Sequence, residues 1–140
     1  MARISWRATS AGADWIDVVV GGLPLSLMVD TGLTDPRNQI GFVLEPATYD
    51  QLKQDRQLSR FRARVSRDAS GRHVTVETAE TSAQLLDPTT REHAGPIVRL
   101  FVSRGAPGVP SRVGVPFFHH LKGCRVEWDF DAQTMLIEYP

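Results

Sequence analysis

Apolar and polar positions alternate with a period of two along most of this chain, and such alternation is typical of half-buried β-strands. Residues 15–20 (WIDVVV) and 23–29 (LPLSLMV) form two apolar runs on either side of Gly21 and Gly22. A two-residue glycine link accepts the positive φ angles of a tight hairpin turn. The pattern therefore predicts a hairpin whose second strand ends at Asp30.

The middle of the chain predicts a short helix and then an extended hairpin. The helix candidate is residues 45–58 (EPATYDQLKQDRQL), where Pro46 suits a first helical position. Residues 60–68 (RFRARVSRD) return to period two, with arginines on one face and mostly apolar residues on the other. A turn is expected at 69–72 (ASGR), and 73–86 (HVTVETAETSAQLL) predicts a long returning strand or a pair of strands.

The last third of the chain predicts further strands separated by loops rich in glycine and proline. In chain order the segments are a turn at 87–96, a strand at 97–103, a loop at 104–116, one helical turn at 117–122, and a hairpin formed by 124–130 and 134–139. No linker or low-complexity tract divides the sequence. We therefore expect a single, mostly β domain over residues 1–140, with one or two short helices.

The composition restricts the kind of partner and sets a default compartment. The 140 residues carry sixteen basic and sixteen acidic side chains, so no net charge draws in nucleic acid or an anionic membrane. The single cysteine, Cys124, cannot form an internal disulfide and is expected to be a small packing residue. The first ten residues lack the apolar core of a signal peptide, and the apolar stretch 15–29 is too short and interrupted to span a bilayer. We therefore expect a cytoplasmic protein.

Asp30 is unusual because it ends a strand that is otherwise suited to burial. A carboxylate beside an apolar wall is costly unless hydrogen-bond donors compensate it. Gly32 lets the backbone turn sharply and bring N–H groups to the carboxylate, and the Thr31 hydroxyl can bond locally or to a partner. Asp-Thr-Gly is also typical of an ordinary turn, so the tripeptide alone does not identify a function.

Longer segments around this tripeptide and further along the chain resemble retropepsin-like aspartic proteases. Residues 18–32 (VVVGGLPLSLMVDTG) are similar to the hairpin that delivers Asp-Thr-Gly to the active site in that family, and residues 66–74 (SRDASGRHV) resemble its flap hairpin. Residues 112–140 resemble its closing pattern of two apolar residues and a glycine, a short helix and a final hairpin. The resemblance implies a closed, orthogonal β-barrel of the acid-protease type.

The resemblance also implies an aspartic endopeptidase that works as a homodimer, because each chain supplies one Asp-Thr-Gly. Two Asp30 carboxylates would meet at a two-fold axis and share one proton, so that one activates a water and the other protonates the scissile carbonyl of a peptide or protein substrate. No metal, cofactor or covalent intermediate is required. The residues implied are Asp30 as the catalytic residue, Thr31, Gly32, Val113 and Gly114 as support of the active-site loop, and Ala69, Ser70 and Gly71 as the flap.

Two departures from the family pattern concern the site itself. Leu33 follows Asp-Thr-Gly where many members have serine or alanine. Arg112 stands at the first apolar position of the element that normally underlies the catalytic loop, and a buried arginine needs a partner. Arg112 either points outward with a shifted loop or changes the floor of the site. The second possibility favours another hypothesis, a catalytically inactive dimerisation or peptide-binding module with the same fold.

Other polar clusters suggest weaker hypotheses. Arg60, Arg62 and Arg64 could form a basic stripe that binds nucleic acid on an unrelated β fold. A solvated strand face explains them more simply given the neutral charge balance, so no nucleic-acid partner is expected. The adjacent His119 and His120 point apart on a helix or a strand, so no metal site is expected.

Overall fold

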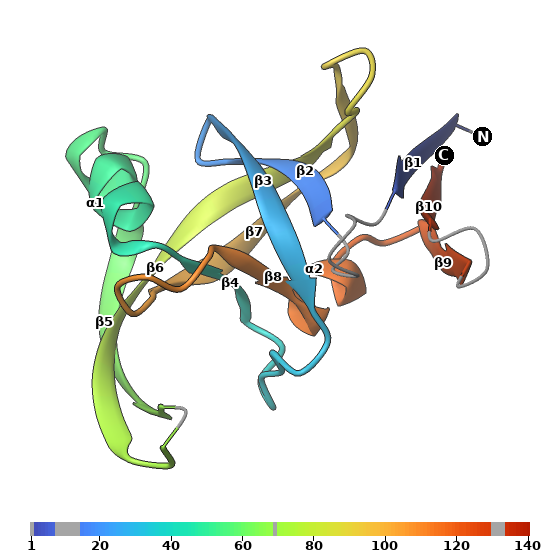
Figure 1. The fold of residues 1–140 in the computed structure, drawn as a ribbon. Helices are drawn as coiled ribbons and strands as arrows, with labels where there is room; N and C mark the ends of the chain where they lie inside the picture. Colours follow the sequence, from blue (N-terminus) through green and yellow to red (C-terminus); the bar gives the residue numbers. More distant parts are fainter. Residues whose placement is uncertain (1, 8–14, 69, 130–133) are drawn as a thin grey trace.

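Six strands close into a β-barrel in the part of the chain that this computed structural model describes, which is residues 2–7, 15–68, 70–129 and 134–140 (Figure 1). The order around the barrel is β2, β3, β8, β4, β7 and β6, and pairing between β2 and β6 closes the ring. β5 pairs with the first part of β6, and β2 pairs with a later part of the same edge of β6. The strands are β2 (Trp15–Val20), β3 (Leu23–Asp30), β4 (Ile40–Leu44), β5 (Ser59–Arg67), β6 (His73–Leu86), β7 (His93–Arg104) and β8 (Arg112–Gly114).

The predicted hairpin over residues 15–30 is confirmed, and it places Asp30 at the end of β3. β2 pairs antiparallel with β3 along the whole length of β2, from Trp15 opposite Met28 to Val20 opposite Leu23. Gly21 and Gly22 connect them with φ angles of 56° and 82°, a region that favours glycine. On its other edge β3 pairs in parallel with β8, which in turn lies between β3 and β4.

Helix α1 (Pro46–Gln54) confirms the predicted helix, although it is shorter than the candidate segment. Pro46 stands in its first turn, and Tyr49 and Leu52 are buried against the barrel. The Tyr49 hydroxyl donates to the Glu77 carboxylate at 3.1 Å. Burial and the negative charge of Glu77 both raise the pKa of Tyr49 well above its ordinary value.

Helix α2 (Val115–His119) follows β8 directly and begins two residues before the predicted helical turn at 117–122. Pro116 fits the first turn of a helix, so the preceding loop can end earlier than the sequence pattern suggests. Phe117 is completely buried and packs on Phe42, with ring centroids 5.1 Å apart. Neither α1 nor α2, the two helices described, has the length and apolar character needed to cross a membrane.

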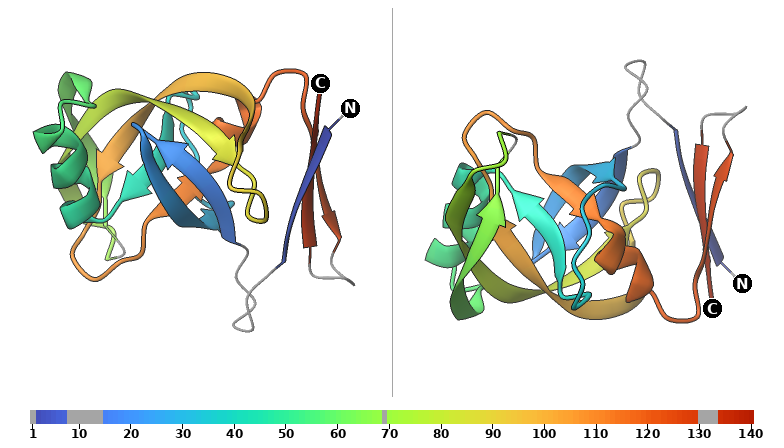
Figure 2. Two further views of the ribbon diagram at one scale, coloured as in Figure 1. Left: turned by 90° about the horizontal axis from the view of Figure 1, so that it is seen from above. Right: turned by 90° about the horizontal axis from the view of Figure 1, so that it is seen from below.

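A second, antiparallel sheet of three strands lies beside the barrel, and it brings the two ends of the chain together (Figure 2). The pairing of β9 with β10 confirms the predicted C-terminal hairpin, whose connection at 130–133 lies outside the described residues. The sequence pattern does not predict β1, because this strand pairs with β10 at the opposite end of the chain. The strands are β1 (Ala2–Arg7), β9 (Arg125–Asp129) and β10 (Thr134–Tyr139).

The prediction of a turn at 93–96 is wrong, because these residues form the start of β7. The pairing of β6 with β7 shifts its register between Ala83 and Leu85, which marks a β-bulge or a similar irregularity. Gly95 has a φ of 69°, and its carbonyl accepts a hydrogen bond from the Gln84 side-chain amide at 2.9 Å. Such an irregularity lets the strand accommodate the glycine and the proline that follows it.

Candidate active site

Asp30 lies at the carboxyl end of β3, directly beside β8. The parallel pairing of these strands sets Val29 opposite Val113 and Asp30 opposite Gly114. Val113 is completely buried, whereas the Asp30 side chain is 28% exposed. Because successive side chains leave opposite faces of a strand, the Asp30 carboxylate is directed away from the core that Val113 enters.

The turn after Asp30 folds its backbone onto the carboxylate. The Gly32 N–H donates to Asp30 Oδ1 at 2.9 Å, and the Leu33 N–H donates to the Asp30 carbonyl oxygen at 3.1 Å. A Cβ added at Gly32 would lie 3.2 Å from Asp30 Oδ1, so a larger residue would press on the carboxylate. Thr31 is exposed between them. The Gly32 N–H on the carboxylate agrees with the contact that Asp-Thr-Gly predicts, although it is one N–H group and not several.

Gly114 supports the same turn from β8. Its φ of −108° and ψ of 175° are extended values that any residue adopts, so the backbone conformation does not require glycine. The lack of space at this position does require glycine, because a Cβ at Gly114 would lie 2.6 Å from the Leu33 carbonyl oxygen and 2.7 Å from Leu33 Cγ. That carbonyl also accepts a hydrogen bond from the Val115 N–H at 3.0 Å. β8 and the turn after Asp30 are therefore in close backbone contact.

Arg112 points at Asp30 and pairs with it. Its Nη1 lies 2.9 Å from Asp30 Oδ2, and each of the two side chains is 28% exposed. Among the described residues the buried Nε of Arg112 has no hydrogen-bond partner. Of the two alternatives that the sequence leaves open, the structure therefore favours a changed floor of the site over an arginine that points away from it.

An apolar recess opens beside Asp30 and Thr31. Its volume is about 390 Å³, and strand β9 and helix α2 provide most of its wall. The Phe118 and Trp128 rings meet edge to face on this wall, with centroids 6.0 Å apart. The sequence pattern does not predict this recess, because its wall comes from segments far apart in the chain. The lining residues are Val29, Asp30, Thr31, Val115, Phe118, His119, Val126 and Trp128.

The loop after the turn is organised by Asp35, a residue that the sequence analysis does not single out. The Asp35 side chain is 4% exposed and accepts hydrogen bonds from the N–H groups of Arg37, Gln39 and Ile40 at 3.1, 3.0 and 2.9 Å. The Arg64 guanidinium approaches it from β5 at 3.4 Å. Burial opposes ionisation of the carboxyl, but these donors outweigh it and hold the pKa of Asp35 below its ordinary value.

Comparison with known proteins identifies the architecture that carries these residues. Neither a protein-family model nor a curated protein matches the sequence. Among solved structures, the chain is similar to a retropepsin-like aspartic protease from Rickettsia conorii, with a TM-score of 0.63 and 17% sequence identity, over 99% of this chain and 91% of that one. This chain has the retropepsin-like fold.

A second solved structure, EIAV protease complexed with the inhibitor HBY-793, matches with a TM-score of 0.45 and 21% identity, over 75% of this chain and 84% of that one. This TM-score is too low to add to the argument. The first match confirms the expected mostly β, closed barrel of the acid-protease type with short helices. At such low identity the likeness shows the retropepsin-like fold and not the chemistry.

The β5–β6 hairpin extends from one end of the retropepsin-like barrel (Figure 1). At its tip the Asp68 carboxylate accepts hydrogen bonds from the Ser70 hydroxyl at 2.6 Å, from the Ser70 N–H at 2.9 Å and from the Arg72 N–H at 3.0 Å. These donors hold the pKa of Asp68 below its ordinary value. Gly71 has a φ of 84°, as a tight turn requires. Ala69, the remaining predicted residue of this tip, lies outside the described residues.

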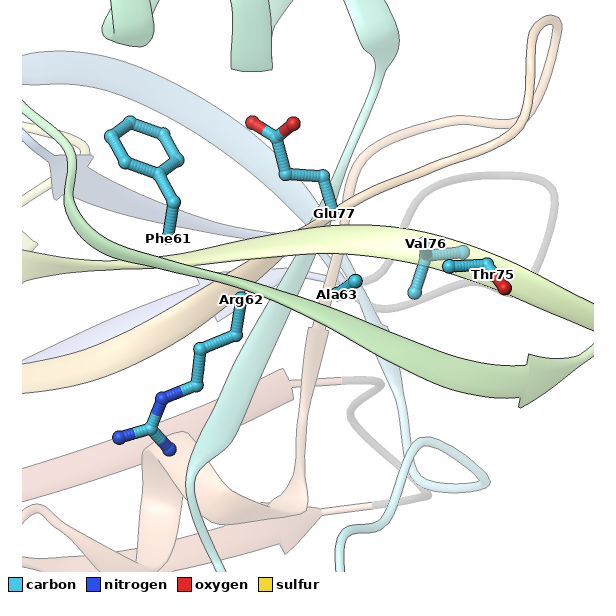
Figure 3. A pocket seen from close by; sticks show the side chains of 6 residues that line it. All are labelled: Phe61, Arg62, Ala63, Thr75, Val76 and Glu77. Atoms are coloured by element: carbon cyan, nitrogen blue, oxygen red, sulfur yellow. The ribbon is translucent and has the colours of Figure 1, made fainter.

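Three arginines of β5, at positions 60, 62 and 64, have partners on the barrel. Phe61 and Arg62 leave opposite faces of the strand, as the predicted alternation requires (Figure 3). The apolar face is not buried, because Phe61 is 48% and Val65 70% exposed. Two of the three lie beside a carboxylate, and the Glu80 carboxylate also pairs with Arg99 at 2.7 Å. The partners are the Glu80 carboxylate at 3.4 Å for Arg60, the Phe101 ring at 5.0 Å for Arg62, and the Asp35 carboxylate at 3.4 Å for Arg64.

The two adjacent histidines both contact Asn38 in the loop after the turn. The His119 Nδ1 lies 3.2 Å from the Asn38 side-chain oxygen, and the His120 Nε2 donates to the Asn38 carbonyl oxygen at 2.7 Å. They therefore connect the end of α2 to this loop. Within the described ranges, no group of three or more His, Cys, Asp or Glu side chains is placed to hold a metal ion.

Proposed function

We propose that this chain is an aspartic endopeptidase that works as a homodimer, with one Asp30 from each protomer. The position of Asp30 carries the proposal. In a retropepsin-like barrel it ends a central strand, receives the Gly32 N–H at 2.9 Å, and lies opposite Gly114 of β8. The carboxylate is rigidly presented but part-exposed, as a group that acts on a bound substrate must be.

A second protomer is needed because one carboxylate cannot serve as both acid and base on the same water. Two Asp30 carboxylates close to a two-fold axis would not both ionise and would share one proton. The ionised carboxylate then takes a proton from the attacking water, while the protonated one donates to the scissile carbonyl oxygen. Gly32 supplies the N–H that holds each carboxylate, and the Thr31 hydroxyls brace the two turns against each other.

The apolar recess beside Asp30 supports the dimer. Side chains such as Phe118 and Trp128 border Asp30 and Thr31, and Trp128 is 37% exposed. An apolar surface next to a candidate active site favours coverage by another chain. A second copy that covers this recess would bring the two Asp-Thr-Gly turns together at the same interface.

The β5–β6 hairpin provides the flap of this proposal, with Ala69, Ser70 and Gly71 at its tip. Val65 and Val76 of the hairpin form a pocket of about 170 Å³ with Leu33, Ile40 and Val43 of the barrel. An extended peptide held between the hairpin and the turn could add main-chain hydrogen bonds as a further strand, and such pockets would then select alternate side chains. The covered site would exclude water from the reacting groups.

The ion pair between Arg112 and Asp30 favours a second candidate, a non-catalytic dimerisation or peptide-binding module of the same fold. A guanidinium 2.9 Å from Asp30 Oδ2 occupies an oxygen that the attacking water or the second carboxylate would need in the endopeptidase mechanism. A dimer in which both Asp30 side chains stay paired in this way could not position that water. This candidate predicts a folded dimer that binds peptides and leaves them intact.

Cleavage of a mixed peptide library separates the two candidates. We expect the wild type to cleave between pH ~3 and ~8, with weaker cleavage at high pH as the pair loses its proton. Asp30→Asn should remain folded and lose activity by roughly a thousandfold or more. Asp50→Asn is the matched control, because that exposed carboxylate pairs with Arg104 on helix α1, outside the site.

Mass spectrometry of the products gives the cleavage positions, and sedimentation gives the oligomeric state. An Asp30→Asn protein as active as the wild type would overturn the endopeptidase proposal. No cleavage by a wild type that is shown to be a folded dimer would favour the peptide-binding module instead.

A further inference from the structure

The partner of Arg112 raises the question of what this guanidinium does once a peptide occupies the site. We propose that Arg112 makes the site selective for peptides with a glutamate or aspartate side chain next to the scissile bond. The inference rests on the proposed function and names its substrate class. Three observations support it: the strand register around Arg112, the incomplete hydrogen bonding of the Arg112 guanidinium, and the pocket between the β5–β6 hairpin and the barrel.

The strand register places Arg112 between Asp30 and a pocket that a substrate side chain could enter. Its cross-strand neighbours are Met28 on β3 and Val43 on β4, and neighbours in register project from the same face of a sheet. Asp30, two residues after Met28, shares that face. Val43 lines the pocket of about 170 Å³ below the hairpin. A side chain that leads from the Asp30 carboxylates into this pocket would therefore pass the guanidinium.

The hydrogen bonding of Arg112 is incomplete. A guanidinium has five N–H donors in a planar fork, and Nη1 donates to Asp30 at 2.9 Å. The Nε is buried and has no partner among the described residues, which is costly for a charged group. Once the guanidinium turns away from Asp30 and Nε is no longer buried, a substrate carboxylate could accept two parallel hydrogen bonds from Nε and an Nη, the strongest geometry that arginine offers. The charged pair that lines the pocket itself, Arg64 with Asp35, is already matched.

Binding of an acidic side chain would also change the state of Asp30. While Arg112 stays on Asp30, its guanidinium lies 2.9 Å from Oδ2, an oxygen that the attacking water or the second carboxylate at the two-fold axis would need. A substrate carboxylate that draws the guanidinium away leaves this oxygen free for them. A neutral side chain offers no such exchange of partners. Acidic peptides would thus be bound more tightly and cleaved faster, whereas neutral peptides would meet an occupied Asp30.

The first experiment compares three peptide series that differ only by Glu, Gln or Leu at each position flanking the scissile bond. For the wild type we expect kcat/KM to be at least about tenfold higher with Glu than with its isostere Gln at one of these positions. Arg112→Leu should lose this preference and gain activity on the Leu series. Arg104→Leu is the control, because it removes an exposed arginine–carboxylate pair outside the site. Equal cleavage of Glu and Gln peptides by the wild type would overturn the inference.

A binding experiment keeps the inference separate from the proposed function. Fluorescence anisotropy of labelled Glu and Gln peptides is measured on Asp30→Asn, with Arg112 intact and with Arg112→Leu, after circular dichroism confirms folding. Preference for Glu that disappears with Arg112→Leu supports the inference even if no variant cleaves any peptide, and in that case only the endopeptidase proposal fails. Binding that does not distinguish Glu from Gln overturns the inference, whatever the cleavage results. If Arg112→Leu does not fold, the comparison of Glu with Gln peptides on the wild type still tests the inference.

Discussion

Replacement of Asp35 by alanine should destabilise the loop that follows the Asp-Thr-Gly turn. The two part-buried N–H groups of Gln39 and Ile40 donate to this carboxylate at 3.0 and 2.9 Å and would lose their acceptor. A hydrogen bond to a charged group contributes at least about 1.5 kcal/mol, so the two together give a loss of about 3 kcal/mol. The Arg37 N–H and the Arg64 guanidinium, at 3.1 and 3.4 Å, are accessible enough for water to replace the carboxylate.

A loss of this size reduces the ratio of folded to unfolded protein roughly a hundredfold and lowers the Tm by about 6–12 °C for a chain of this length. Urea and thermal unfolding followed by circular dichroism would measure it, at one fixed protein concentration because a dimer links stability to concentration. Asp35→Asn should lose less, because its amide oxygen keeps one acceptor in place. Asp50→Ala removes an exposed pair with Arg104 and should change the stability little.

The loss of stability in Asp35→Ala should depend on pH, and the lowered pKa of Asp35 sets the direction of that dependence. The pKa of Asp35 is lower in the folded chain than in the unfolded one, so its contribution is complete above the ordinary aspartate pKa and is lost as the pH falls through the folded pKa. The difference in unfolding free energy between the wild type and Asp35→Ala should therefore shrink below pH ~4. An Asp35→Ala protein within about 0.5 kcal/mol of the wild type at neutral pH would refute the reasoning.

Two further predictions concern Gly114 and Cys124. Gly114→Ala places a Cβ 2.6 Å from the Leu33 carbonyl oxygen and should cost about 1–3 kcal/mol while it lowers any peptide cleavage. Gly114→Val, which places a larger side chain at the same point, should cost more than Gly114→Ala, and a Gly114→Ala protein within about 0.5 kcal/mol of the wild type would contradict the steric argument. Burial raises the pKa of the Cys124 thiol, so iodoacetamide should alkylate the folded chain more slowly than the urea-unfolded chain at pH ~8, and equal rates would contradict this.

The sequence by itself determined the elements whose signals lie close together in the chain. The Gly21-Gly22 link between two apolar runs predicted the first hairpin and the position of Asp30 at its end. Pro46 marked the start of α1, and the alternation on both sides of residues 69–72 predicted the long hairpin. Each of these depends on residues within one turn or one hairpin, so a local pattern is sufficient.

Elements that depend on distant partners were missed or misplaced. β1 is held by β10 at the opposite end of the chain, and β4 is a short apolar run that becomes a strand by pairing with β7 and β8. The first residues of β7 looked like a turn because Gly95 and Pro96 favour turns, but a shift in its pairing with β6 retains them in the strand. Residue types at these positions allow several structures, and pairing selects one of them.

The candidate active site also combines a local feature that the sequence predicts with a distant contact that it does not. Asp30, Thr31 and Gly32 are adjacent in the sequence, so the hydrogen bond from Gly32 to the carboxylate follows from the tripeptide itself. Arg112 is 82 residues from Asp30, and the sequence could only mark it as an arginine in an apolar position. Its direction depends on which strands neighbour β8 and in what register. A periodic pattern tells which residues share a face of one strand but not which strands lie side by side, so only the tertiary structure could place this guanidinium on Asp30.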